Sequence, residues 1–276
     1  MRRLIFLILA LLAVVYCSGC AGTVDKQNDA AKKQSYVVQD VRGKKLSFES
    51  KPQKIISLYV YGDEVLLGLV DHKRIAGLSK WVHDEDLAMG AKEAKDVTKI
   101  AESNPEAILA LKPDLVLLPD SSKPEQISSL EDVGIKVFVY PAASRLSNIP
   151  KTIKAIGGAV GEPEQAEKLI AEMQKKISAV EAKVKKMQPE DRKKGLLFLR
   201  FGAIGGKGII FNDIMTAAGV EDCYEAARHT IADKPGTSRI LSKEEVVQAN
   251  PDYIIIGTWS QGGAYKSGNA QLEELY

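Results

Sequence analysis

Aromatic and cationic side chains recur at or just beyond the ends of predicted strands, and they are the residues best suited to chemistry in this chain. They are Tyr59, Tyr61, Trp81, His83, Arg200, Phe201, His229 and Trp259. Large flat side chains with a few cations suit a bulky, planar or polyanionic ligand. Ligands of open α/β sheets bind outside the carboxyl ends of the strands, so the group predicts a binding site. Any one of them could instead be half-buried core or exposed rim.

Motifs for catalysis or nucleotide binding are incomplete. The glycine-rich segment 202–208 follows a predicted strand and precedes a predicted helix, but Phe201 replaces the first glycine of a Walker loop and Gly208 replaces its final hydroxyl residue. We therefore expect a flexible loop at the mouth of a cleft. No G-x-S-x-G motif is present, and the three histidines lack the spacing of a zinc site. The residues favour a binding protein over an enzyme and assign no metal ligand.

A repeated module predicts how these residues are positioned. Residues 106–118 (EAILALKPDLVLL) return as residues 244–256 (EEVVQANPDYIII), each running from an acidic helix start through Pro-Asp into an apolar strand. Pro113 and Pro251 end their helices because proline cannot continue the hydrogen-bond ladder. The apolar runs behind them favour parallel strands covered on both faces. One αβ module used twice predicts two similar lobes, and therefore a cleft.

Other local signals predict alternating strands and helices, which indicate α/β lobes. Asp63 is expected to cap a helix over residues 64–69, and Ser103 to cap a helix with Pro105 in its first turn and Glu106 three residues after the cap. The remaining elements are a hairpin over 37–48, strands over 55–58, 74–78, 135–140 and 196–201, helices over 126–132 and 211–218, and a capping box at Ser242. The second repeat ends inside the helix after its strand, so we expect the second lobe to lack at least one strand and its covering helix.

Residues 149–187 are predicted to be helical, with a break at residues 161–163. In the second segment, Met173, Ile177, Val180, Val184 and Met187 form one apolar stripe. A coiled-coil partner is possible, but one helix supplies few heptads, so a single helix packed across both lobes is favoured. It has no glycine and no proline after its first turn, and should be rigid.

The N-terminus predicts an exported lipoprotein. Arg2 and Arg3 precede an apolar run over residues 4–15, which is short for a membrane span. The tripeptide Ser18-Gly19-Cys20 looks like a lipobox, in which the cysteine is lipidated, although Cys17 stands where leucine is usual. An ordinary cleaved signal with Cys20 nearby by chance is the alternative. The predicted organisation is a signal peptide over 1–19, anchor and tether over 20–36, a first lobe over 37–148, connecting helices over 149–190 and a second lobe over 191–276.

The net charge and the number of cysteines limit the classes of binding partner and the disulfides that this chain can have. Loss of the two arginines in the signal peptide leaves 36 basic and 36 acidic residues of the 38 and 36 in the whole chain. A nearly neutral chain makes nucleic acid or an anionic membrane surface an unsuitable partner. If Cys20 is lipidated, Cys223 is the only remaining thiol, so we expect no internal disulfide and an inert cysteine.

A further set of motifs runs along the chain: Lys54-Ile-Ile-Ser-Leu58, Asp63-Glu-Val-Leu66, Arg74-Ile-Ala-Gly77, the two Pro-Asp modules, Gly157 to Gly161 with the long helix after it, and Ala218-Gly219. In these motifs the chain resembles, from residue 37 to residue 276, the iron-siderophore, haem and vitamin B12 class of substrate-binding proteins of ABC transporters. The resemblance implies an α/β fold of two Rossmann-like lobes joined by one long rigid helix, with ligand between the lobes. Relatives continue past residue 276, which agrees with an incomplete second lobe.

The resemblance also implies function and partners. A lipid-anchored receptor at the outer face of the cytoplasmic membrane, acting as a monomer, would deliver its ligand to a permease dimer driven by a cytosolic ATPase. A ferric siderophore is the favoured ligand, with haem and cobalamin as alternatives; we expect no intrinsic cofactor. His83 and His229 lie where haem-binding relatives place iron ligands. Glu125 matches the first of two acidic permease contacts, and Glu273 and Glu274 are candidates for the second. An α/β enzyme or a surface adhesin would need motifs or repeats that the sequence lacks.

Overall fold

The computed structural model describes residues 35–85, 87–100, 104–199, 202–205, 209–223 and 239–256. An antiparallel hairpin of β1 (Tyr36–Gln39) and β2 (Lys45–Phe48) begins this part of the chain, as predicted. A parallel five-stranded sheet follows, in the order β5-β4-β3-β6-β7. Its strands are β3 (Ile55–Ser57), β4 (Ile75–Ser79), β5 (Lys99–Ile100), β6 (Leu115–Pro119) and β7 (Val137–Tyr140).

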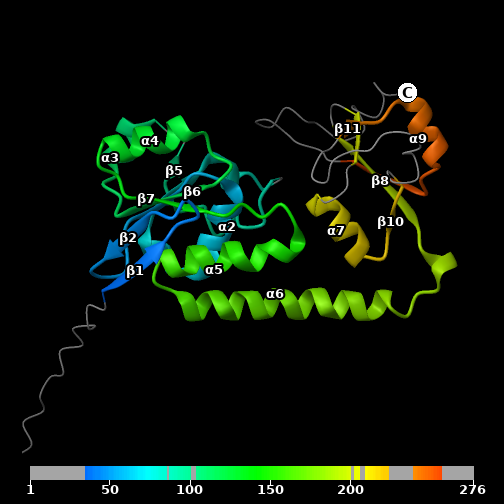
Figure 1. The fold of residues 1–276 in the computed structure, drawn as a ribbon, viewed down its shortest axis with the longest axis horizontal. Coiled ribbons are helices and arrows are strands. Elements are labelled where there is room, and N and C mark those ends of the chain that lie inside the picture. Colours follow the sequence, from blue (N-terminus) through cyan, green and yellow to red (C-terminus); the bar gives the residue numbers. More distant parts are fainter. Residues whose placement is uncertain are drawn as a thin grey trace, which may run out of the picture. The chain divides into compact units, whose positions relative to one another are not determined.

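Helices cover both faces of this sheet (Figure 1). Leu115 and Leu117 of β6 pack with α2 (Val60–Leu69), α5 (Ile149–Ala159) and α6 (Pro163–Val184) on one face. Val116 and Leu118 point to the other face and pack with α3 (Pro105–Ala110) and α4 (Pro124–Asp132). All five residues of β6 are buried. The prediction of a strand covered on both faces is therefore confirmed for the first Pro-Asp module.

Two predicted helix caps are wrong. Asp63 does not cap a helix; α2 begins at Val60, and Asp63 is a fully buried residue inside it. It accepts hydrogen bonds from Ser79, a contact across the fold that local pattern does not reveal. The cap of α3 is Asn104, whose side chain accepts from the Ala107 N–H at 2.8 Å. Ser103 lies outside the described residues.

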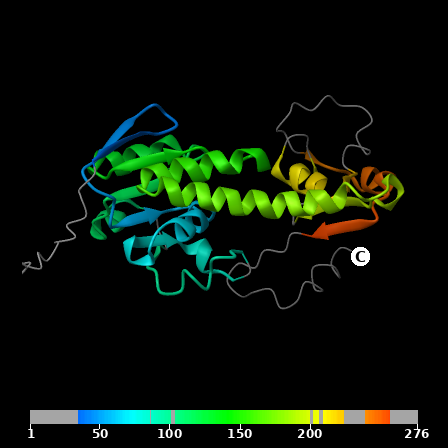
Figure 2. The same ribbon diagram turned by 90° about the horizontal axis from the view of Figure 1, so that it is seen from below.

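The break between α5 and α6 is built for close packing, and both views show the two helices side by side (Figures 1 and 2). A Cβ on Gly157 would lie 2.4 Å from the Cβ of Ala166, so the helices approach closely only because this residue is glycine. Gly161 turns the chain with a φ of +75°, a conformation that glycine adopts without strain. Arg74 then fixes the junction, donating to Glu162 at 2.5 Å and to the Val160 carbonyl at 2.6 Å.

Helix α6 contacts both α5 and α7 (Ile210–Ala217), as expected for a single packed helix. Ala166 and Ile170 are its buried residues, whereas Val180 of the predicted stripe is 45% exposed. At its C-terminal end, Val184 lies so near Gly219 that a Cβ on the glycine would come within 2.9 Å. None of the described helices is long and apolar enough to cross a membrane.

The second sheet is mixed, with β8 (Lys194–Leu199) pairing with three strands. β10 (Glu221–Asp222) and β12 (Tyr253–Ile256) run parallel to it, and β9 (Gly202–Gly205) runs antiparallel. β11 (Arg239–Ile240) pairs with β9. We predicted a flexible loop at residues 202–208; this is wrong for residues 202–205, because pairing with two strands outweighs the weak strand preference of glycine.

The covered-strand prediction is also wrong for β12. Its four residues are between 36% and 59% exposed, and the buried core of this sheet gathers on Leu196, Cys223, Leu241 and Ala249. Helix α9 (Lys243–Ala249) begins with the predicted capping box at Ser242. Cys223 is buried and unpaired, and burial raises the pKa of its thiol to about 11, which keeps the thiolate scarce near neutral pH.

The Pro-Asp repeat has the same hydrogen bonds in both copies. Asp114 donates its N–H to the Lys54 carbonyl at 2.8 Å, and its carboxylate accepts from the Lys54 N–H at 2.9 Å. Asp252 makes the same two bonds with Lys194, at 3.0 Å and 2.7 Å. The aspartate therefore bonds to the residue at the start of the neighbouring strand, Lys194 of β8, or just before it, Lys54 ahead of β3. The residues before the prolines, Lys112 and Asn250, both have positive φ.

Candidate ligand-binding site

Tyrosine rings gather at the carboxyl ends of β3 and β7, where the sequence predicted a binding site. The ring of Tyr61 meets the ring of Tyr140 edge-on at 5.9 Å and lies 6.2 Å from the ring of Tyr59. The Tyr61 hydroxyl is 3.3 Å from the Ser121 hydroxyl, beyond the end of β6. The Tyr59 hydroxyl donates to Gln126 of α4. These contacts hold both tyrosines at the strand ends.

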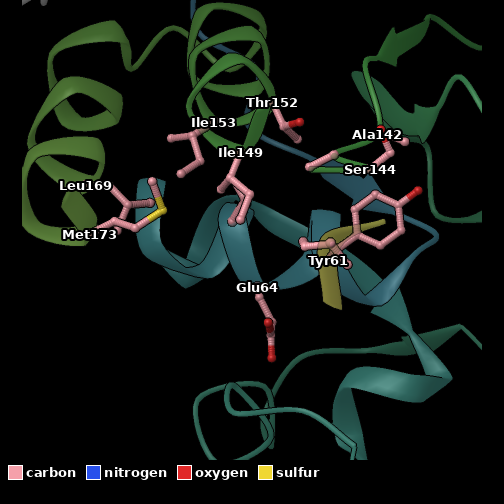
Figure 3. A pocket seen from close by; sticks show the side chains of 12 residues that line it. Tyr61, Glu64, Ala142, Ser144, Ile149, Thr152, Ile153, Leu169 and Met173 are labelled. Atoms are coloured by element: carbon pink, nitrogen blue, oxygen red, sulfur yellow. The ribbon is translucent and has the colours of Figure 1, made fainter. Parts of the chain in front are cut away.

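A pocket of about 630 Å³ lies beside Tyr61, between α2, α5 and α6 (Figure 3). Apolar side chains make most of its wall, and polar groups come from Tyr61, Glu64, Ser144 and Thr152. Its lining residues are Tyr61, Glu64, Val65, Ala142, Ala143, Ser144, Ile149, Thr152, Ile153, Leu169, Met173 and Ile210. A large, mostly apolar pocket with a few polar groups is the usual form of a small-molecule site.

Trp81 and His83 lie in the short 3-10 helix η2 (Lys80–His83), at the end of β4, but neither lines this pocket. The Lys80 ammonium lies 4.6 Å from the ring centre of Trp81. Both ring nitrogens of His83 face backbone carbonyl oxygens, of Ser79 at 3.2 Å and of Val97 at 3.0 Å. His83 would have to give up one of these contacts to bind a metal.

A buried acid, Asp63, lies on α2 two residues after Tyr61. Asp63 accepts from the hydroxyl of Ser79 at 2.5 Å and from its N–H at 3.2 Å, and so anchors the residue that precedes η2. Removal from water raises the pKa of Asp63 to about 7, although the hydrogen bonds from Ser79 oppose the shift. Its other carboxyl oxygen and the hydroxyl of Tyr140 have no hydrogen-bond partner within the described protein.

The structure places only part of the predicted site. Tyr59 and Tyr61 come together, Trp81 and His83 occupy the neighbouring strand end, and Glu125 is exposed in the first turn of α4. Five predicted site residues (Arg200, Phe201, His229, Trp259 and Cys20) and the candidate docking acids Glu273 and Glu274 lie outside the described residues. The described residues contain no group of three histidines, cysteines or acids that could hold a metal ion.

Sequence reasoning missed most of the pocket wall. Ile149, Ile153, Leu169 and Met173 are apolar residues at helical spacing, a pattern that usually marks core. Glu64 belongs to the motif Asp63-Glu-Val-Leu66, but nothing in the sequence marks it as a binding residue. Nothing in one sequence says that α5, α6 and the start of α7 meet around one space.

Known proteins with similar sequences are binding proteins. The chain is 27% identical over 259 residues to an uncharacterized ABC transporter substrate-binding lipoprotein, YvrC, of Bacillus subtilis, covering 89% of this chain and 77% of the relative. It is 27% identical to the vitamin B12-binding protein of Pectobacterium atrosepticum, covering 80% and 75%. The iron(3+)-hydroxamate-binding protein YxeB of B. subtilis is 23% identical, with 95% and 79% covered.

Solved structures share the fold. A periplasmic binding protein from Veillonella parvula superimposes with a TM-score of 0.65 at 20% identity, covering 87% of this chain and 82% of the other. The haem-binding protein HmuT gives a TM-score of 0.61 at 21% identity, covering 84% and 74%. The family model described as periplasmic binding protein matches residues 55–274, which include both Pro-Asp modules and the described pocket. The chain therefore belongs to the periplasmic binding protein family.

Proposed function

We propose that this chain is the substrate-binding component of an ABC importer and that it captures a chelated metal complex or a corrinoid. The observation that carries the proposal is the apolar pocket beside Tyr61, at the strand ends where the tyrosines gather. A chelated metal arrives with its coordination positions already filled. Aromatic and apolar walls are therefore enough to hold it, without protein ligands to the metal.

Two ligand classes have support. A ferric siderophore suits a site of tyrosines and apolar walls, and a relative named as a ferric-hydroxamate-binding protein aligns with nearly the whole chain. Cobalamin is supported by the relative named as a vitamin B12-binding protein. Haem has less support, because its two propionates are anions that pair with cationic side chains, and the described pocket wall has no lysine or arginine. Both ring nitrogens of His83, a candidate haem ligand, already face backbone carbonyl oxygens.

The proposed setting is the outer face of the cytoplasmic membrane. The apolar segment followed by Ser18-Gly19-Cys20 supports a lipid anchor at Cys20, and the relative YvrC is named as a lipoprotein. A monomer held there would hand its ligand to a permease dimer coupled to a cytosolic ATPase. Glu125, exposed on α4, is proposed as one docking contact.

Tryptophan fluorescence tests the ligand assignment, since Trp81 and Trp259 are the two tryptophans of the chain. The full chain is titrated with ferrioxamine B, ferrichrome, cyanocobalamin and haemin. Free N-acetyltryptophanamide corrects for light absorbed by the ligands. We expect saturable quenching at micromolar concentrations by a siderophore or by cyanocobalamin, and weaker quenching by haemin. Quenching no greater than that of the free tryptophan analogue by every compound would rule the proposal out.

A further inference from the structure

We propose that Glu64 selects the charge of the ligand, so that this pocket favours a cationic complex over a neutral or anionic complex of the same shape. The inference rests on the proposed function and goes beyond it by naming a specificity-determining residue. It assigns a role to a side chain that no motif singled out.

Glu64 is the one charged residue among the twelve that line the described pocket. It lies on α2, one turn beyond Tyr61, and Figure 3 shows its carboxylate below that ring, pointing away from Ile149 and Met173. The side chain is half-buried. Within the described part of the chain, no lysine, arginine or histidine forms an ion pair with it. Its negative charge is therefore not neutralised by those residues.

The carboxylate is held in place and is not a freely rotating surface group. One of its oxygens accepts a hydrogen bond from the backbone N–H of Met89 at 2.8 Å. Gly90, the next residue, lies so close to α2 that a Cβ there would come within 2.8 Å of Leu67. The segment around residue 90 thus packs against α2 and holds the carboxylate in a fixed position.

The charge of Glu64 also acts on the adjacent residue, Asp63. Among the causes that raise the pKa of the buried Asp63, after desolvation, is repulsion from Glu64. A positive group several ångströms from a half-buried carboxylate gains about fivefold in affinity over a neutral one.

Two matched pairs of ligands isolate charge from shape. Ferrioxamine B carries a free ammonium, and its N-acetyl derivative is the same iron chelate without that charge. Aquocobalamin is a cation, and cyanocobalamin is its neutral counterpart. Dissociation constants for each pair are measured on the full chain by calorimetry, for wild type, Glu64→Gln and Glu106→Gln. Glutamine keeps the size of Glu64 and an oxygen for the Met89 N–H, while Glu106 is an exposed glutamate in the first turn of α3.

Wild type should prefer the cation of at least one pair by about fivefold, and Glu64→Gln should bring that ratio close to one. Glu106→Gln should keep the wild-type ratio. Binding of both members with equal affinity, or a preference that survives in Glu64→Gln, would overturn the role of Glu64 and leave the proposed function standing. If wild type binds no member of either pair, the proposed ligand classes fail and this inference fails with them.

Discussion

The carboxyl group of Asp63 is the residue whose environment has the clearest consequence for stability. It is fully buried, and its pKa is about 7 in the folded protein, against about 3.9 in an unfolded chain. The folded state therefore holds this proton more tightly than the unfolded state. The resulting contribution to stability is complete below pH 4 and is lost as the pH rises through 7.

Asp63→Asn should remove this pH dependence. Relative to the variant, wild type should lose up to about 4 kcal/mol of unfolding free energy between pH 4 and pH 8, because three pKa units separate the two states. Urea unfolding at a series of pH values measures the difference. Asp132→Asn, at an exposed position at the end of α4, is the control and should follow wild type. Parallel curves for wild type and Asp63→Asn would show that Asp63 does not titrate in this range.

Individual residues also mark where sequence reasoning stops. Tyr59 and Tyr61 could be predicted at the site, because the ends of parallel strands meet at one edge of a sheet. Asp63 was assigned to a helix cap because an acid before an apolar run has that local signature. Its true partner, Ser79, is 16 residues away and follows from the pairing of β3 with β4. A local sequence signal does not report contacts between segments that are distant in the chain.

At the scale of elements, the packing of α5 on α6 depends on one of two adjacent glycines. A Cβ on Gly157 would collide with the Cβ of Ala166, whereas a Cβ on Gly158 would have Val38 as its nearest neighbour at 3.9 Å. Both glycines lie within the same helix, α5. The pair therefore separates the effect of helix propensity from the effect of helix–helix contact.

Gly157→Ala should destabilise the protein by about 1–3 kcal/mol, because the two helices must move apart. Gly158→Ala should be neutral or stabilise it by up to about 1 kcal/mol, since alanine is the better helix former. Thermal and urea unfolding of both variants gives the comparison. Equal effects of the two substitutions would mean that the close approach of α5 and α6 contributes nothing to stability.

The elements themselves were predictable where each signal had one reading. Pro113 and Pro251 follow apolar helical runs and predict that those helices end, and the repeat that contains them predicted β6 and β12. The residues after Pro-Asp are equally apolar in both copies, yet β6 is buried and the side chains of β12 are exposed. Whether a strand is buried depends on the elements packed against it, and the residues of the strand do not specify those elements. Likewise, β9 forms from a glycine-rich segment because β8 and β11 pair with it.

At the scale of the whole molecule, function requires a second surface that is separate from the ligand pocket. Glu125 is exposed on α4 and does not line the pocket. A charge at such a position mostly affects association with a partner. Glu125→Arg should therefore leave the affinity for a siderophore or for cyanocobalamin unchanged and reduce uptake by cells by at least tenfold.

Uptake of a labelled ligand by cells and calorimetry on the purified chain provide the two readouts. Glu164→Arg is the matched control, because Glu164 is likewise an exposed glutamate in the first turn of a helix. It should retain uptake. A loss of ligand affinity in Glu125→Arg would place this residue in the binding site, and unchanged uptake would remove it from the docking surface.

If ligand binds in the pocket beside Tyr61, a large side chain that fills this pocket must weaken binding. Ala143 is a small lining residue in the segment after β7, and Ala171 is an exposed alanine on α6 that does not line the pocket. Calorimetric titration with ferrioxamine B and cyanocobalamin compares wild type, Ala143→Trp and Ala171→Trp, after circular dichroism has shown that all three fold. We predict one site per chain, at least tenfold weaker binding in Ala143→Trp, and unchanged binding in Ala171→Trp. Wild-type affinity in a folded Ala143→Trp would contradict this prediction.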